Sequence, residues 1–372
     1  MKAIIQKRIA AIRKALIEAQ VDALMVSVQY NRYYLSGFSA EDTQFDESAG
    51  VLIVSDRHLI LATDSRFELQ AQREAPGFDI VCYRNGLEKE LPAIASAVGI
   101  RRIGFESARI SHKQHAAYTD VLGRLERPIA LVPTANMVEA LRQVKSEEEI
   151  QKTVQALRLA EDAFLSVLDR VRPGLTEKEA AWALEKAMRE AGAQSPSFPV
   201  IVASGPNSAL PHAVPSDRKM APGEPILFDW GARLDEYCSD TTRTLVIGKP
   251  DRHFKKVFDT VVRARDMAIA AIRSGASGTQ VDQIARDHIS QSGFAGKFGH
   301  GLGHGTGLAV HESPRLSPIT DERLESGMIV TVEPGIYLPG WGGIRMENQV
   351  VVRESGAQVL NHPAPFDPVL EV

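Results

Sequence analysis

The feature that most constrains how this chain can fold is a pair of strand-like segments, each carrying two acids placed symmetrically about a turn. Asp229 and Asp240 are equally far from a turn at 234–235, in the segment ILFDWGARLDEYCSDTTRTLVI. Glu333 and Glu347 are equally far from a turn rich in proline and glycine, in the segment IVTVEPGIYLPGWGGIRMENQVVV. If both hairpins are regular, the two acids of each pair lie directly opposite one another.

Facing carboxylates of this kind repel one another. Like charges on paired strands cost up to about 1 kcal/mol when they are exposed, and more when they are buried. Both segments are rich in Val, Ile, Leu and Phe, which indicates burial. The four carboxylates carry a charge of −4, which two divalent cations would balance. The pattern therefore predicts a metal site, against the alternative that one of the pairs faces solvent.

Histidines gather in the same part of the chain. Three of the ten, His300, His304 and His311, fall in the glycine-rich stretch FGHGLGHGTGLAVHES, and His212 lies in the loop SGPNSALPHAVP. A lone histidine is more often structural, but imidazoles near carboxylates are suited to metal binding and proton transfer. The chain has no phosphate-binding glycine loop, no HExxH helix and no GxSxG nucleophile turn. We therefore favour metal and proton-transfer chemistry.

The sequence predicts that the chain folds into two domains. Residues 4–19 carry an apolar stripe at helical spacing, and short apolar runs then alternate with helical stretches up to 132–135, which is typical of a small α/β domain. Two capping boxes follow, Ser146 with Glu149 and Thr176 with Glu179, each of which predicts the start of a helix. Long helices and mainly antiparallel strands then indicate an α+β domain. We expect the domains to span 1–134 and 135–372.

Composition excludes several other classes of protein. The net charge of −4 shows no basic excess of the kind that nucleic-acid or anionic-lipid binding requires. No apolar run is long enough to span a membrane. Only two cysteines occur, Cys82 and Cys238, which excludes a disulfide framework and predicts a reduced, cytoplasmic setting.

These residues resemble a known family. The motifs LFDWGA, YCSDTTRT, HGLGHGTGLAVHE, TVEPGIYLPG and GGIRMEN are similar to those of the pita-bread metallopeptidases, in the branch that contains the Xaa-Pro aminopeptidases and prolidases. The first domain resembles the creatinase-type N-terminal domain of that branch. The resemblance covers essentially the whole chain and implies a pita-bread catalytic domain of α+β class behind a smaller α/β domain.

Residue by residue, the resemblance implies a dinuclear metal centre with five ligands. Asp240 and Glu347 would bridge the two ions. Asp229 would complete the ligand set of one ion, and His304 and Glu333 would complete that of the other. Creatinase itself shares the fold but lacks these ligands, so the complete set in this chain disfavours metal-free chemistry. An oxygen-rich site with one imidazole suits Mn²⁺ or Co²⁺, with Zn²⁺ or Fe²⁺ as alternatives.

The resemblance also implies how the centre would act. Glu333 would shuttle a proton from the metal-activated hydroxide to the leaving nitrogen. His212 and His311 would contact the substrate and the tetrahedral intermediate. His300 would line the pocket for proline. A homodimer is implied as well, in which residues 30–38 (YNRYYLSGF) of one subunit would line the cleft of the other.

Several further positions bear on this prediction. Arg345 and Tyr337 match residues that support the metal ligands from behind. Arg315 occurs where some prolidases bind the free carboxylate of a dipeptide, although an ordinary surface arginine is an equal alternative. Asn348 replaces an aspartate of many relatives, and we expect it to point away from the ligands. We interpret Cys238 as a small buried hydrophobe.

The predicted function is hydrolysis of the bond between an N-terminal residue and proline, as an Xaa-Pro aminopeptidase or an Xaa-Pro dipeptidase. One alternative is an aminopeptidase that prefers N-terminal Met or Ala and uses the same site. A second is a non-catalytic peptide-binding module, and a third is lyase or other non-peptide chemistry on the same metals. The sequence leaves the native metal and the choice between dipeptide and longer substrates open.

Overall fold

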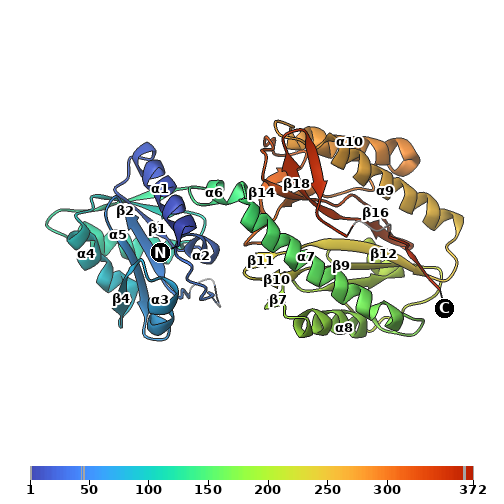
Figure 1. Ribbon diagram of the computed structural model, residues 1–372, viewed down its shortest axis with the longest axis horizontal. Coiled ribbons are helices and arrows are strands. Elements are labelled where there is room, and N and C mark those ends of the chain that lie inside the picture. Colours follow the sequence, from blue (N-terminus) through green and yellow to red (C-terminus); the bar gives the residue numbers. More distant parts are fainter. Residues whose placement is uncertain (1, 43, 45–46, 363–365, 372) are drawn as a thin grey trace. The chain divides into compact units, whose positions relative to one another are not determined.

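The structure is a computed structural model that describes residues 2–42, 44, 47–362 and 366–371. Backbone contacts divide the chain into two compact units, Met1–Arg142 and Gln143–Val372 (Figure 1). The division falls within the short helix α6 (Glu139–Gln143). The boundary predicted after residue 134 falls earlier, where strand β6 (Ala130–Thr134) ends.

The first unit is built on one six-stranded sheet with helices on both faces (Figure 1). Its strand order is β4-β3-β2-β1-β5-β6, in which β2 runs antiparallel to its neighbours and the other pairs are parallel. This confirms the predicted α/β class. The elements before β6 are α1 (Ala3–Glu18), β1 (Ala23–Val26), α2 (Gln29–Ser36), β2 (Val51–Ser55), β3 (Leu59–Asp64), α3 (Glu68–Glu74), β4 (Asp79–Tyr83), α4 (Leu87–Val98), β5 (Arg102–Glu106) and α5 (His112–Gly123).

Apolar periodicity decides which side of each helix packs against the sheet. Helix α1 buries the stripe that its sequence predicts, composed of Ile5, Ile9, Ile12 and Leu16. On the other face, α4 and α5 contribute residues such as Leu91 to a core with the alternate side chains of the strands (Figure 1).

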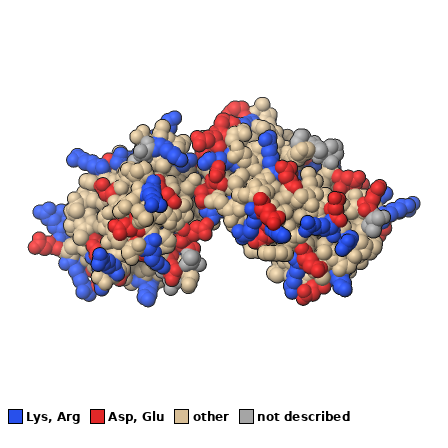
Figure 2. All heavy atoms as spheres, turned by 60° about the horizontal axis from the view of Figure 1, so that its bottom comes forward, with Lys and Arg blue, Asp and Glu red and all other residues tan. Residues whose placement is uncertain are grey.

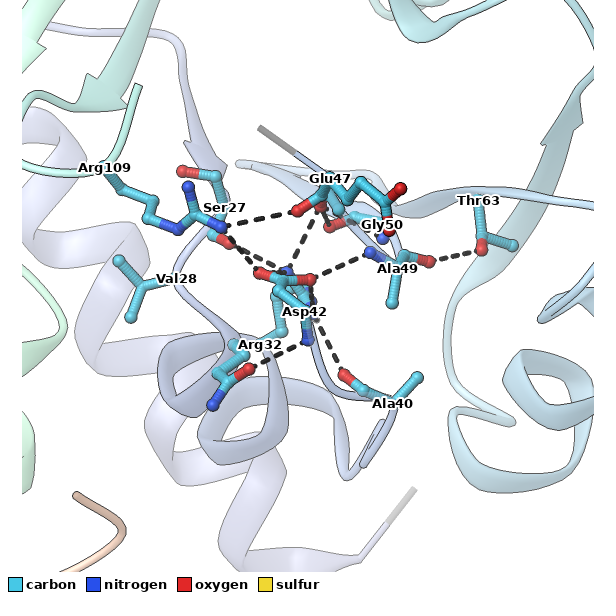
Figure 3. A network of polar contacts seen from close by, with 12 residues as sticks. Ser27, Val28, Arg32, Ala40, Asp42, Glu47, Ala49, Gly50, Thr63 and Arg109 are labelled. Carbon is cyan, nitrogen blue, oxygen red and sulfur yellow. Dashed lines mark hydrogen bonds and ion pairs between the residues drawn. The ribbon is translucent and has the colours of Figure 1, made fainter. Parts of the chain in front are cut away.

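A buried arginine fastens part of the connection between α2 and β2. Arg32 on α2 is fully buried, pairs with Asp42 at 2.8 Å and donates a hydrogen bond to the carbonyl oxygen of Ser27. Asp42 also pairs with Arg109 at 3.2 Å and accepts a hydrogen bond from the N–H of Ala49 (Figure 3). Because a buried charge is tolerated when it is paired, this network stabilises the described part of the connection.

Helix α2 contains most of the stretch that we assigned to a neighbouring subunit's cleft. Tyr34, Leu35 and Phe38 are at most 5% exposed, so they belong to the core of their own unit. Tyr30 is partly exposed and is the kind of side chain that a neighbour could reach. The contact itself stays a prediction.

The second unit contains the same arrangement twice, two helices followed by antiparallel strands (Figure 1). The first half comprises α7 (Glu147–Val167), α8 (Glu177–Glu190), β7 (Ser195–Pro196), β8 (Ile201–Ser204), β9 (Pro225–Trp230), β10 (Ala232–Leu234), β11 (Tyr237–Cys238) and β12 (Thr241–Ile247). The second comprises α9 (Arg252–Ala271), α10 (Gly278–Ile289), β13 (Gly303–Gly305), β14 (Glu312–Leu316), β15 (Ile329–Val332), β16 (Gly335–Leu338), β17 (Gly342–Arg345), β18 (Asn348–Arg353) and β19 (Gly356–Val359), and β20 (Val369–Leu370) follows.

Each helix pair covers mainly the sheet of its own half. Helices α7 and α8 pack on the sheet β20-β12-β9-β8 around buried residues such as Phe164 and Trp230. Helices α9 and α10 pack on the sheet β14-β13-β15-β18-β19 around residues such as Val257. The N–H of Glu347 donates to the carbonyl oxygen of Thr242 at 3.1 Å and so connects the two halves.

The predicted α+β class is confirmed, and so are both capping boxes.

The first predicted hairpin is present, but its register differs from the prediction. Asp229 lies opposite Thr242 and not opposite Asp240. The turn consists of Asp235 and Glu236, whose φ angles of 47° and 72° are those that a type I′ turn requires. The prediction that the two aspartates lie directly across from one another is therefore wrong. Because the shift is by an even number of residues, both side chains still point to the same face.

The second pair of acids has the predicted register. Val332 pairs with Asn348 on one side of the two glutamates, and Gly335 pairs with Arg345 on the other. The glutamates lie between these pairs, so the register on both sides of them agrees with the prediction, and their direct facing stays a prediction.

Two findings bear on the classes of protein excluded above. Among the described residues, no helix combines the length and the apolar character needed to cross a membrane. On the face of the molecule in Figure 2, the Lys and Arg side chains lie among Asp and Glu side chains. This face therefore offers no continuous basic surface of the kind that nucleic acid requires.

Gly231 provides a test of the observed register. A Cβ atom at this position would lie 1.9 Å from the carbonyl oxygen of Ser239. Gly231→Ala should lower the free energy of unfolding by about 1–3 kcal/mol, because the backbone must move to admit the methyl group. Gly356→Ala, where a Cβ meets open space, should change it by less than about 1 kcal/mol. Urea unfolding followed by tryptophan fluorescence measures both values, and equal stabilities would contradict the close approach.

Candidate metal centre

Three carboxylates meet where the two halves of the second unit join. Asp229 lies on β9, Asp240 directly precedes β12, and Glu347 directly precedes β18. One oxygen of each lies within 4.8 Å of the others, and the residues are only 9%, 5% and 1% exposed. The acids converge because each of them lies in a strand or directly before one, and these strands meet where the two halves are hydrogen-bonded to each other.

Two of these carboxylates are held by only one of their oxygens. Asp229 Oδ2 accepts a hydrogen bond of 2.6 Å from Arg345 Nη2, and Glu347 Oε2 accepts one of 2.8 Å from Thr242 Oγ1. The other oxygens, Asp229 Oδ1 and Glu347 Oε1, are buried and have no hydrogen-bond partner within the described part of the chain. Leaving a buried acceptor unsatisfied costs free energy, which a cation at this point would offset.

The pKa values of the three acids reflect the same crowding. Burial, followed by the charges of Glu347 and Asp229, raises the pKa of Asp240 well above its usual value. Burial and the charge of Glu333 likewise raise the pKa of Glu347. For Asp229, burial raises the pKa by more than the nearby guanidinium group lowers it. Added positive charge is what would let all three acids ionise together.

His304 on β13 points its Nε2 atom into this cluster. Its Nδ1 lies 3.1 Å from the carbonyl oxygen of Gly305, which can only accept, so Nδ1 carries a proton. Nε2 lies 3.6 Å from Asp240 Oδ2 and 3.3 Å from Glu333 Oε1. Nε2 is therefore the ring atom that is oriented to bind a metal, with its tautomer fixed by the backbone.

Glu333 directly follows β15 and lies next to this imidazole. Burial alone would raise its pKa, but the hydrogen bond with His304, followed by the nearby imidazole rings and the guanidinium group of Arg345, lowers the pKa to about 2. An ionised Glu333 beside His304 Nε2 is a combination that suits a divalent cation. The side chain is also fixed by a hydrogen bond of 3.1 Å from Thr331 Oγ1 to Glu333 Oε1.

The donor set fits a divalent transition metal. It combines carboxylate oxygens with one imidazole nitrogen, two of the oxygens are otherwise unsatisfied, and the arrangement carries excess negative charge. All five residues that the sequence analysis named as ligands lie in this one place. Which residue binds which ion stays a prediction.

Arg345 and Tyr337 connect the acids to His300. Besides Asp229, Arg345 donates through Nη1 to the Tyr337 hydroxyl oxygen at 2.9 Å. The hydroxyl group in turn lies 2.8 Å from His300 Nε2, and His300 Nδ1 lies 2.8 Å from the carbonyl oxygen of Gly301. Since Nδ1 must donate to that carbonyl, Nε2 accepts from tyrosine and the ring is neutral. Burial, which lowers the pKa of His300, acts in the same direction.

The acids line a pocket of about 520 Å³ that opens toward solvent. Besides the five predicted ligands, its lining includes His212, His300, His311, Arg315 and Arg345. Apolar side chains, among them Phe198, Pro199, Ile201 and Val214, form part of the wall. A pocket that joins a few polar groups to an apolar wall is typical of a small-molecule or peptide site.

The two histidines predicted to touch substrate both reach this pocket. His212 is exposed on the loop between β8 and β9, and the exposed His311 directly precedes β14. The His311 ring lies 4.4 Å from the His304 ring between centroids, in an edge-on arrangement. The residue as a whole is exposed, but its ring is partly desolvated by the pocket, and this desolvation, followed by the nearby His304 and Arg315 side chains, lowers the pKa of His311 to about 4. At neutral pH this imidazole is therefore uncharged.

Arg315 lies on β14 directly opposite His304 on β13. Directly paired residues point to the same face of a sheet, so the guanidinium group extends into the pocket. The described residues provide it with no hydrogen bond or ion pair. This observation favours a ligand-binding role over the alternative of an ordinary surface arginine.

Two threonines that the sequence analysis did not name also belong to the centre. Thr242 donates to Glu347 and accepts a hydrogen bond of 3.1 Å from Arg345 Nε. Thr331 accepts from the N–H of His304 at 3.0 Å besides donating to Glu333. Each threonine stands two residues from a predicted ligand on the same strand face, and that spacing could have identified both.

Cys238 is a buried hydrophobe, in agreement with the sequence analysis. It is 4% exposed, burial raises the pKa of its thiol to about 11, and its Sγ contacts the carbonyl oxygen of Leu308 at 3.7 Å. A thiol held in its protonated form is a poor metal ligand.

Comparison with known families identifies both units. Residues 151–354 match the model of metallopeptidase family M24, and residues 8–144 match the model of the creatinase/prolidase N-terminal domain. An uncharacterised peptidase of Bacillus subtilis (strain 168), YqhT, is 39% identical over 342 residues, which are 92% of this chain and 94% of that protein.

Solved structures extend this similarity to the whole fold. The Xaa-Pro dipeptidase from Bacillus anthracis has a TM-score of 0.92 and 35% identity, covering 98% of this chain and 100% of that one. The X-Pro aminopeptidase from Thermotoga maritima MSB8 has a TM-score of 0.85 and 35% identity, covering 95% of this chain and 98% of that one. Two relatives of equal identity thus bear a dipeptidase and an aminopeptidase name.

The crowded acids predict how stability should depend on pH when metal is removed. Asp229, Asp240 and Glu347 have raised pKa values in the folded protein. Their stabilising contribution is complete below the pKa of unfolded acids, about 4, and is lost as the pH rises through the raised values. Glu333 acts in the opposite direction, because its contribution is lost only as the pH falls from about 4 toward 2.

Bound cations would neutralise the three acids and so remove the loss at higher pH. We therefore expect Mn²⁺ to raise the thermal unfolding midpoint, relative to protein in EDTA, by more at pH 8 than at pH 5. Differential scanning fluorimetry over this pH range measures the difference. The same stabilisation at both pH values would contradict the electrostatic description of the centre.

Proposed function

Because this chain belongs to metallopeptidase family M24, we propose that it hydrolyses the bond between an N-terminal residue and a following proline, with two divalent metal ions as cofactors. One observation carries the proposal. Buried carboxylates with unsatisfied oxygens line the same pocket as four histidines and Arg315, which extends into it. Relatives named Xaa-Pro dipeptidase and X-Pro aminopeptidase support the choice of proline.

Asp229, Asp240, His304, Glu333 and Glu347 would hold the ions. When bound, two divalent cations would make a water molecule more acidic and polarise the carbonyl group of the scissile bond. We assign Mn²⁺ or Co²⁺ to the site, with Zn²⁺ or Fe²⁺ as alternatives, because carboxylates outnumber the single imidazole.

Glu333 is the residue that we assign to proton transfer. Its Oε1 is engaged by Thr331 and lies next to His304, so Oε2 is the oxygen available for a proton. It would take a proton from the attacking water and deliver it to the proline nitrogen as the peptide bond breaks. That nitrogen needs a proton because an unprotonated nitrogen would have to leave as a strongly basic anion, whereas the protonated nitrogen leaves as the neutral amine of proline.

His311 and His212 would stabilise the oxygen that becomes negative during the attack. A neutral imidazole can donate one N–H to a developing oxyanion, and the pKa of about 4 keeps His311 neutral at physiological pH. His212 lines the same pocket from a separate loop, so the two donors could approach the substrate from different elements.

Proline would bind against the apolar part of the pocket. Both nitrogens of His300 are engaged by Tyr337 and Gly301, so this residue presents ring carbons to a ligand. With Phe198, Ile201 and their neighbours, it provides a surface suited to a pyrrolidine ring. A rigid ring that needs no N–H partner matches such a wall better than a flexible polar side chain does.

The cellular setting and assembly are part of the same proposal. Cys82 and Cys238 are free thiols, which supports a reducing, cytoplasmic location. A homodimer is part of this proposal, as the resemblance to the Xaa-Pro branch implies, and the match of the first unit to the creatinase/prolidase N-terminal domain supports that resemblance.

The first test is substrate cleavage by metal-loaded protein. We expect release of alanine from Ala-Pro or Ala-Pro-Ala with Mn²⁺ or Co²⁺, and little release of methionine from Met-Ala. Asp240→Asn should abolish turnover and lower the bound metal measured by mass spectrometry, because it removes one of the three crowded anions. Asp217→Asn, at an exposed ion pair with Lys178, should behave as wild type. Cleavage that persists in exhaustively chelated, metal-free protein would refute the proposal.

Arg315 provides a second test, which separates dipeptides from longer substrates. If its guanidinium group binds the free carboxylate of Ala-Pro, Arg315→Met should raise KM for this dipeptide by about 10-fold or more, because a charged hydrogen bond is lost. KM for Ala-Pro-Ala, whose carboxylate lies one residue further along, should change much less. Arg323→Met, an exposed arginine outside the pocket lining, is the matched control. A uniform effect on both substrates would contradict the assignment.

A further inference from the structure

We propose that Lys145, the residue before α7's N-cap, is a positioning residue that holds His311 in place from outside the pocket. The inference rests on the proposed function, because it concerns how His311 is oriented for that reaction. Lys145 is remote from His311 in sequence and does not line the pocket. It acts through Glu312, the neighbour of His311.

Lys145 and Glu312 form one of the most buried ion pairs in the described structure. Lys145 Nζ lies 3.1 Å from Glu312 Oε2, and the two side chains are only 2% and 6% exposed. Lys145 Nζ also donates to the carbonyl oxygen of Gln143 at 3.2 Å. Breaking such a pair leaves an uncompensated buried charge, so its geometry is strongly maintained.

The second oxygen of Glu312 organises the turn that precedes it. Glu312 Oε1 accepts a hydrogen bond of 2.9 Å from the N–H of Ala309. The carboxylate also lies over Gly307, where a Cβ would come within 2.8 Å of Oε2. Gly307 itself donates to the carbonyl oxygen of Ala309 at 3.0 Å. The Glu312 carboxylate therefore holds the turn that precedes His311, and Lys145 holds the carboxylate.

The position of this turn matters because it sets the distance between two functional histidines. His304 on β13 and His311 before β14 belong to the two arms of one antiparallel pair, and their rings are in contact. The register of this pair shifts between His304 and Gly305, so regular pairing alone does not determine where His311 lies. The ion pair and the hydrogen bond of Glu312 therefore help to determine where His311 lies.

The first turn of α7 holds the adjoining strand as well. Glu149 completes the capping box through Oε2, which accepts from the N–H of Ser146, while its Oε1 accepts from the Tyr237 hydroxyl group at 2.8 Å. Cys238, next to Tyr237, donates its N–H to the carbonyl oxygen of Gly307 at 2.8 Å. The sequence KSEEE (145–149) at the start of α7 therefore contacts two segments beside the pocket. Lys145 contacts Glu312, and Glu149 contacts Tyr237.

The test uses two variants that separate positioning from stability. Lys145→Met leaves the Glu312 carboxylate buried without this cation, so it should lower stability as well as activity. In Lys145→Met/Glu312→Gln both charges of the pair are removed, and the introduced amide can still accept from the N–H of Ala309, but the connection to α7 is lost. We expect this double variant to keep its metal content and thermal midpoint, to keep KM for Ala-Pro within about twofold, and to lose about 10-fold or more in kcat.

A matched control comes from the same helical turn. Glu147 pairs with Arg353 at the end of β18, away from the pocket lining. Arg353→Met should therefore retain wild-type kcat. The proposal is overturned if either Lys145 variant keeps wild-type kcat, if metal content and kcat fall in parallel, or if Arg353→Met loses as much activity. A metal-loaded wild type that cleaves neither Ala-Pro nor Ala-Pro-Ala would instead refute the proposed function.

Discussion

Negative charge gathered in a buried site is the constraint on which the second unit depends. Asp229, Asp240 and Glu347 stand within a few ångströms of one another, and the described protein supplies only one guanidinium group, that of Arg345, in direct contact with their carboxylate oxygens. Protein groups satisfy one oxygen of Asp229 and one of Glu347, and leave the other oxygen of each open. Hydrogen bonds to the backbone and to Tyr337 hold His300 and His304 in fixed orientations around these acids. Such fixed orientations are what a metal site requires of the groups around it.

The sequence predicted the convergence of the acids more reliably than their pairing. Apolar strands with mirrored carboxylates indicated a common face, and side-chain alternation preserves that face when the register moves by an even number of residues. The first register was wrong because the turn residues Asp235 and Glu236 both adopt positive φ, which their identities do not signal as strongly as Asn-Gly would. The second register was right because Gly340, with φ of 85°, marks the centre of its turn clearly.

Features that depend on nearby residues could be predicted from the sequence, whereas contacts between distant residues could not. The helix stripe of α1 and the capping boxes of α7 and α8 depend on residues three or four apart, so the sequence was sufficient to predict them. The place of Arg315 opposite His304 depends on a strand pairing with an irregular register, and spacing alone could not reveal it. The pair of Lys145 with Glu312 joins residues separated by 167 positions, and only the folded chain brings them together.

The division of the second unit into two halves has a consequence for biosynthesis. Asp229 and Asp240 belong to the half that leaves the ribosome first, whereas His304, Glu333 and Glu347 belong to the half that follows. The five predicted ligands can therefore come together only after both halves have been synthesised and have packed against one another.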